Sequence, residues 1–118
     1  MSRGPKPCRA LKAAIPLAKH RGIIQMAGNS PENLYDFAIV STMQVAFIRV
    51  KYAARILSSP PEIAAEFREV ILALQAIPYD TAISRELWLC SKHGTLRFFR
   101  ILAEQLIELG LDGQPRSV

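Results

Sequence analysis

The sequence lacks the features on which several large classes of protein depend. Only two of its 118 residues are cysteines, Cys8 and Cys90, and neither has the Cys-x-x-Cys or Cys and His spacing of a zinc site. No apolar run approaches the roughly 18 to 20 residues that a membrane-spanning helix needs. No serine lies in a Gly-x-Ser-x-Gly segment, and the two histidines have no metal-ligand spacing. These absences argue against a zinc site, a membrane span and serine catalysis, and favour a reducing, cytoplasmic location.

Acidic residues are missing from the N-terminal quarter of the chain. Residues 1–31 carry a charge of +6 with no acid, whereas residues 32–118 have nine basic and ten acidic residues. A basic arm commonly contacts nucleic-acid phosphates, where each neutralised phosphate adds salt-dependent affinity. A solvated tail and an Arg-rich targeting segment are the alternatives. The candidate nucleic-acid contacts are Arg3, Lys6, Arg9, Lys12, Lys19 and Arg21, with Arg49 farther along the chain.

The length of the chain fits one compact domain with a sizeable core, since half of the residues are apolar. Prolines and a glycine in the first nine residues predict an irregular basic arm over 1–9. The folded domain is expected over 10–112, followed by a tail over 113–118.

The apolar pattern predicts an α/β domain. Ser59 and Glu62 form a capping-box pattern that opens the clearest helix. The strand-like runs are continuously apolar, which favours a central mixed sheet of about five strands covered by helices on both faces. Residues 103–113 fit either a short helix or an edge strand. The expected elements are a short or kinked helix over 10–22, a strand over 23–27, a hairpin of 35–40 and 45–51, a helix over 58–77, and a second hairpin of 83–91 and 95–102.

The segment "YDFAIV" places Asp36 at the start of one strand, and "IRVK" places Lys51 at the end of the next. With the order of elements, this arrangement resembles the PD-(D/E)XK nuclease superfamily, in particular the archaeal Holliday-junction resolvases. The resemblance covers roughly residues 10–102. It implies a restriction-endonuclease-like fold and a DNA endonuclease that uses Mg²⁺ or Mn²⁺, with Asp36 as metal ligand and Lys51 stabilising the developing charge.

The chain departs from that family pattern at the position two before Lys51. The family has a carboxylate there, but this chain has Arg49, whose guanidinium has no lone pair to offer a metal. Arg49 could instead pair with Asp36 and occupy the place of the metal. Glu66, on the following helix, is the preferred candidate for a second metal ligand and catalytic carboxylate. The acid that the family expects on the first helix is also missing. Weak or lost activity is therefore expected.

Two functional hypotheses follow. The first is a nucleic-acid-associated, nuclease-like domain that binds branched or duplex DNA. The second is a non-catalytic structural or interaction domain, in which Arg49 and Lys51 are neutralised by Asp36 and Glu66 and the edge near 96–101 pairs two copies as a homodimer.

Aromatic and basic residues of the last two predicted strands leave a further choice open. Trp88, Phe98 and Phe99 are expected in the core, with base stacking as the alternative. Arg85 and Arg97 would extend a phosphate-binding surface if they face the same side of the sheet as Lys51.

Overall fold

A computed structural model describes residues 8–28 and 33–116, and in these it has three helices and six strands. The α/β class is as the sequence predicts, but there are six strands instead of about five, because part of the undecided segment 103–113 forms a strand. In chain order the elements are α1 (Cys8–Ala18), β1 (Ile23–Met26), β2 (Phe37–Val40), β3 (Val45–Tyr52), α2 (Pro60–Glu66), α3 (Arg68–Gln75), β4 (Ile83–Cys90), β5 (Leu96–Ile101) and β6 (Leu106–Leu109).

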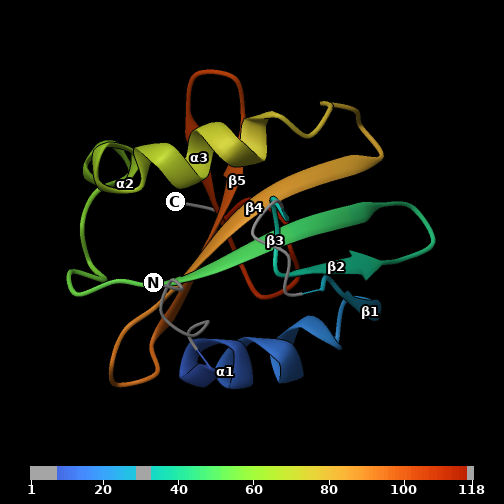
Figure 1. The fold of residues 1–118 in the computed structure, drawn as a ribbon, viewed down its shortest axis with the longest axis horizontal. Helices are drawn as coiled ribbons and strands as arrows, with labels where there is room; N and C mark the ends of the chain where they lie inside the picture. Colours follow the sequence, from blue (N-terminus) through green and yellow to red (C-terminus); the bar gives the residue numbers. More distant parts are fainter. Residues whose placement is uncertain (1–7, 29–32, 117–118) are drawn as a thin grey trace.

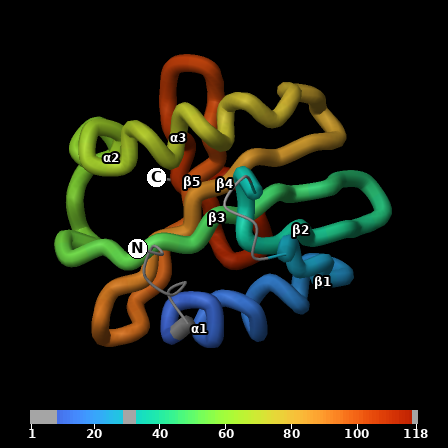
Figure 2. The backbone as a smooth tube through the Cα atoms, in the orientation of Figure 1, coloured from blue at the N-terminus to red at the C-terminus, as the bar shows by residue number. Residues whose placement is uncertain are grey.

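The six strands form one mixed sheet in the order β1-β2-β3-β4-β5-β6. Neighbouring strands are antiparallel, except that β3 and β4 run parallel. A parallel pair needs a crossover, and the chain makes it through α2 and α3 (Figure 2). Figure 1 shows the result as three layers, with α1 on one side of the sheet and α2 and α3 on the other.

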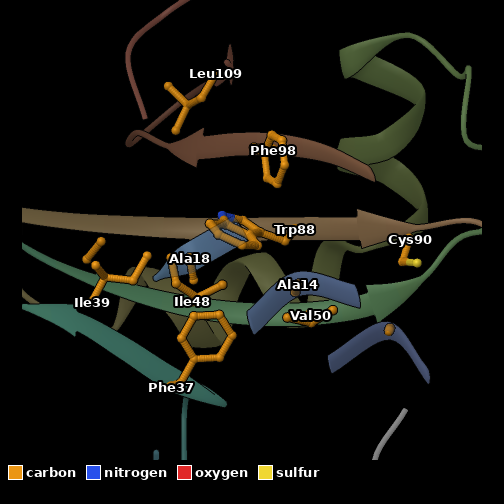
Figure 3. Close-up of a cluster of buried hydrophobic side chains, with 12 residues drawn as sticks. Ala14, Ala18, Phe37, Ile39, Ile48, Val50, Trp88, Cys90, Phe98 and Leu109 are labelled. Carbon is orange, nitrogen blue, oxygen red and sulfur yellow. The ribbon is translucent and has the colours of Figure 1, made fainter. Parts of the chain in front are cut away.

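The first core lies between the sheet and α1. Trp88 is at its centre, and its ring meets the rings of Phe37 and Phe98 edge-on, with centroids 5.7 and 4.6 Å apart (Figure 3). The small side chains of Ala14 and Ala18 are fully buried against them, so α1 packs closely on the sheet. Aromatic pairs in this geometry are stabilising beyond the area that they bury.

The second core lies between the sheet and the helices α2 and α3. It contains Ile63 and Leu74 from the helices and Leu87, Leu89 and Phe99 from the strands. With Trp88 and Phe98 in the first core, all three aromatic residues are therefore buried, as expected. Apolar side chains thus project from both faces of the central strands into the two cores. This is why the sequences of these strands are continuously apolar.

The helix predicted over 58–77 begins as expected but is not continuous. Ser59 is its N-cap, and the capping box with Glu62 is formed in both directions. Phe67 then leaves helical geometry, with φ −106° and ψ 29°, and separates α2 from α3. No glycine or proline causes this break. It is a tertiary effect, because α2 contacts β6 while α3 contacts β4 and β5.

Both ends of the domain differ from the predicted boundaries. The helix α1 already begins at Cys8, within the predicted arm, and residues 1–7 lie outside the described residues. At the other end, the chain folds back onto β6, where the Arg116 amide donates to the Glu108 carbonyl at 3.0 Å. The segment predicted as a tail therefore contacts the sheet at least as far as Arg116.

The strand β5 is not at the edge of the sheet. It lies between β4 and β6, so the expected exposed edge near 96–101 is wrong. The sequence did not decide whether residues 103–113 form a helix or a strand. Part of this segment forms β6, which pairs with the edge of β5. Within the described ranges, no helix has the length and apolar character that crossing a bilayer requires.

Candidate functional site

Asp36, which is buried, and Arg49, which is partly buried, form an ion pair at one end of the β2–β3 hairpin. The hairpin register pairs Phe37 with Ile48, which puts Asp36 directly opposite Arg49. The Arg49 Nη1 atom donates to Asp36 Oδ1 at 3.1 Å, and the Val50 amide donates to Oδ2 at 2.8 Å. The Asp36 side chain is only 2% exposed. The ion pair that the sequence suggested is therefore present, and protein donors bind both carboxylate oxygens.

Arg49 is fixed on its other side as well. Its Nη2 atom donates to the Asn33 carbonyl at 2.9 Å, so the guanidinium joins β3 to the chain before β2. A guanidinium bound in two directions is held in a definite orientation. Arg49, expected among the nucleic-acid contacts, thus has an internal structural role in this conformation.

Lys51 lies on the same face of the sheet as Arg49, since alternate residues of β3 share a face. Its side chain is partly buried. Within residues 8–28 and 33–116, the Lys51 side chain makes no hydrogen bond or ion pair. Lys51 therefore differs from Arg49 in having no internal anion to neutralise it in the described structure.

Glu66 is not joined to this pair. Its side chain is exposed at the end of α2, where it borders a surface hollow with Arg55 and Glu62. Neither a hydrogen bond nor an ion pair links Glu66 to Asp36 or Lys51 among the described residues. In the same part of the chain, no three His, Cys, Asp or Glu residues are grouped so that they could hold a metal ion.

Arg85 and Arg97 do face the same side of the sheet as Lys51, but they do not form an exposed surface. Arg85 is 6% exposed, and its guanidinium donates to three backbone carbonyls, of Gln75, Ile77 and Ile101. Arg97 donates to two loop carbonyls before α2 and to Glu108. The helices and loops of this layer enclose both guanidinium groups. The two arginines thus face the side of the sheet that the prediction required. The prediction that they would then extend a phosphate-binding surface is wrong, because they are not free at the surface.

The Arg97–Glu108 pair gives a testable pH dependence. Hydrogen bonds from Arg97 at 2.8 and 2.9 Å lower the pKa of Glu108 from its ordinary value of 4.5. A pKa lowered by folding stabilises the folded state above the ordinary pKa, and this contribution is lost as the pH falls through the folded pKa. We expect Glu108→Gln to flatten the loss of stability below about pH 5.

Urea unfolding at a series of pH values measures this effect. Glu104→Gln is the matched control, since Glu104 is exposed on the turn before β6 and makes no ion pair in the described structure. A Glu108→Gln profile parallel to that of wild type would show that the pair adds no pH-dependent stability.

The predicted basic residues of the N-terminal quarter divide into two groups. Arg9, Lys12 and Lys19 are exposed on α1 or just after it. Arg21 is not: its side chain is 10% exposed, and it pairs with Glu86. Arg3 and Lys6 lie outside the described residues.

Glu86 is the centre of a buried polar network that the sequence did not reveal. Its carboxylate is fully buried and receives two hydrogen bonds from Arg21, at 2.8 and 2.9 Å. Ser84 and the Trp88 indole donate the other two, at 2.7 and 3.0 Å. Gly113 allows the close approach of Arg21, because a Cβ atom there would lie 2.5 Å from the Arg21 Cζ atom. The signal available in the sequence was an acidic residue, Glu86, within an apolar strand. It does not identify the partner, because Arg21 is 65 residues away in the chain.

Compared with known proteins, the chain matches no family model, no curated protein and no solved structure.

Proposed function

We propose that this chain is a nucleic-acid-binding domain of the PD-(D/E)XK nuclease type in which Arg49 has replaced a metal ligand, so that it binds without cleaving. The observation that carries the proposal is the Asp36–Arg49 ion pair. The family resemblance assigns a metal-binding carboxylate to each of these two positions. The order of elements is in keeping with that resemblance. It consists of a helix, three antiparallel strands, a helical crossover and then β4, which is parallel to β3.

The chemistry of the pair supports the loss of cleavage. Metal-assisted hydrolysis needs carboxylates that hold a divalent cation next to the phosphate. Here the Asp36 carboxylate is already paired with the Arg49 guanidinium. A divalent ion at Asp36 Oδ1 would have to compete with the Arg49 guanidinium, which binds that oxygen and repels another cation.

Exposed charge supports the binding part of the proposal. The chain has a formal charge of +5. Arg21 and Arg49 are internally paired, while Arg9, Lys12 and Lys19 are exposed. Exposed cations without internal partners can replace the counterions of a phosphate backbone.

A binding and cleavage assay on the Arg49→Glu variant tests the proposal. Wild type is expected to bind DNA at low salt, to lose affinity steeply as salt rises, and to leave DNA intact with Mn²⁺. Arg49→Glu creates two facing carboxylates, so Mn²⁺ should raise its melting temperature and not that of wild type. Asp36→Ala/Arg49→Glu is the control, and it should lose the Mn²⁺ effect.

Three results would contradict the proposal in different ways. Cleavage by wild type that Asp36→Ala abolishes would make the chain an active nuclease. No Mn²⁺ stabilisation of Arg49→Glu would leave the nuclease ancestry without support. No nucleic-acid binding at low salt would favour a structural or interaction domain.

A further inference from the structure

A cavity of about 510 Å³ opens at the carboxyl ends of the parallel strands β3 and β4. Its walls come from the start of α1, the last residue of β3 and the turn between β4 and β5. A larger cavity of about 940 Å³ lies at the opposite end of the same strands, around residues 41–44 and 81–82. Ligands of open α/β sheets bind at the carboxyl ends of the strands, which directs attention to the smaller cavity.

The cavity wall is basic. Arg9, Lys92 and His93 line it, and there is no acid among the described residues of the lining. All three side chains are exposed, and no described residue forms an ion pair with Arg9 or Lys92. Because Arg9 and Ala10 belong to the first turn of α1, the positive end of that helix dipole lies at the same wall. The electrostatics favour an anionic group, such as a phosphate.

The cavity also has an aromatic wall. Tyr52 lines it and is 51% exposed, although it follows directly after buried and partly buried residues of β3. The small side chains of Ala10 and Ala13 form an apolar part of the lining. An exposed ring beside cations is the combination with which proteins bind unpaired bases and their phosphates.

We propose that this cavity binds a nucleotide of a single-stranded nucleic acid, with its phosphate against Arg9 and Lys92 and its base stacked on Tyr52. This inference rests on the proposed function and deepens it by naming the class of nucleic acid. A base inside a duplex is stacked between its neighbours and paired, so it does not present its face to a protein ring. The site therefore selects single strands or unpaired ends over uninterrupted duplex.

Fluorescence anisotropy with a labelled oligothymidylate and a blunt duplex of the same length tests the inference. Wild type is expected to bind the single strand more tightly. Tyr52→Ala should weaken single-strand binding by about tenfold and leave the salt dependence unchanged, because stacking involves no counterion release. Tyr52→Phe keeps the ring and should bind as wild type does. Arg9→Ala and Lys92→Ala should each reduce the slope of log K against log salt by about 0.7.

The matched control is Arg68→Ala, which removes an equal charge from an exposed position at the start of α3, on the other face of the sheet. Circular dichroism checks that each variant is folded, as expected for substitutions of exposed side chains. If the single strand binds but the cavity variants behave like Arg68→Ala, the inference is wrong and the proposed function stands. A preference for the duplex also overturns the inference alone. If neither nucleic acid binds at low salt, the proposed function fails, and this inference fails with it.

Discussion

Glu86→Gln is expected to reduce the free energy of unfolding by about 3 to 5 kcal/mol. The substitution keeps the size of the side chain but removes its charge, leaving the Arg21 guanidinium, 10% exposed, without its counter-ion. The new amide group also brings two donors to a position that already receives hydrogen bonds from Ser84 and Trp88. A loss of this size is a large part of the 5 to 15 kcal/mol that typically stabilises a domain.

Urea unfolding followed by the fluorescence of Trp88, the only tryptophan, measures this loss. Arg116→Ala is the control, because that arginine makes an ion pair with Glu108 but is 62% exposed. It should cost less than about 1 kcal/mol. The double variant Arg21→Met/Glu86→Leu leaves no buried charge unpaired. Its loss of unfolding free energy should therefore be much smaller than the sum of the losses for Arg21→Met and Glu86→Leu alone. A Glu86→Gln protein within about 1 kcal/mol of wild type would show that the network contributes little to stability.

Asp36→Ala is expected to reduce the free energy of unfolding by about 3 kcal/mol. It leaves the buried Val50 amide without its acceptor and the partly buried Arg49 guanidinium without its anion. Asp36→Asn should cost less, because the amide oxygen can still accept from Val50. Adding Arg49→Met to Asp36→Ala should recover part of the loss by removing the unpaired charge.

The sign of the Asp36→Ala effect distinguishes an ion pair from an empty metal site. Carboxylates that share a metal site repel one another when the ion is absent, so removing one of them would raise the melting temperature. The pair with Arg49 predicts the opposite sign. Melting temperatures of wild type, Asp36→Ala and Asp36→Asn without divalent ions decide between the two.

Local features of the fold could be predicted from the sequence because they depend on neighbours along the chain. The capping box needs only Ser59 and Glu62, three positions apart. The turn at 92–94 depends on Gly94, whose φ of 86° favours glycine. The contact between Asp36 and Arg49 also follows from short-range geometry, because a hairpin register sets which residues lie opposite each other.

Whether Arg85 and Arg97 are exposed or enclosed could not be predicted in the same way. Strand periodicity correctly puts Arg85 and Arg97 on the face of Lys51, but it does not say what covers that face. The backbone carbonyls that bind Arg85 come from the end of α3, from the loop after it and from β5. Whether a guanidinium meets solvent or a helix end is decided by the packing of separate elements.

The sequence by itself determined the α/β class, the two hairpins and the burial of Trp88, Phe98 and Phe99. It also determined that Asp36 lies opposite Arg49 in the first hairpin. Only the tertiary structure decided that residues 106–109 form β6, because a short apolar segment suits a helix or a strand until a neighbouring strand offers hydrogen-bond partners. It also decided that Arg21 pairs with Glu86, and that Arg9, Tyr52 and Lys92 line one cavity. These residues are far apart in the chain, and only the packing of α1 on the sheet brings them together.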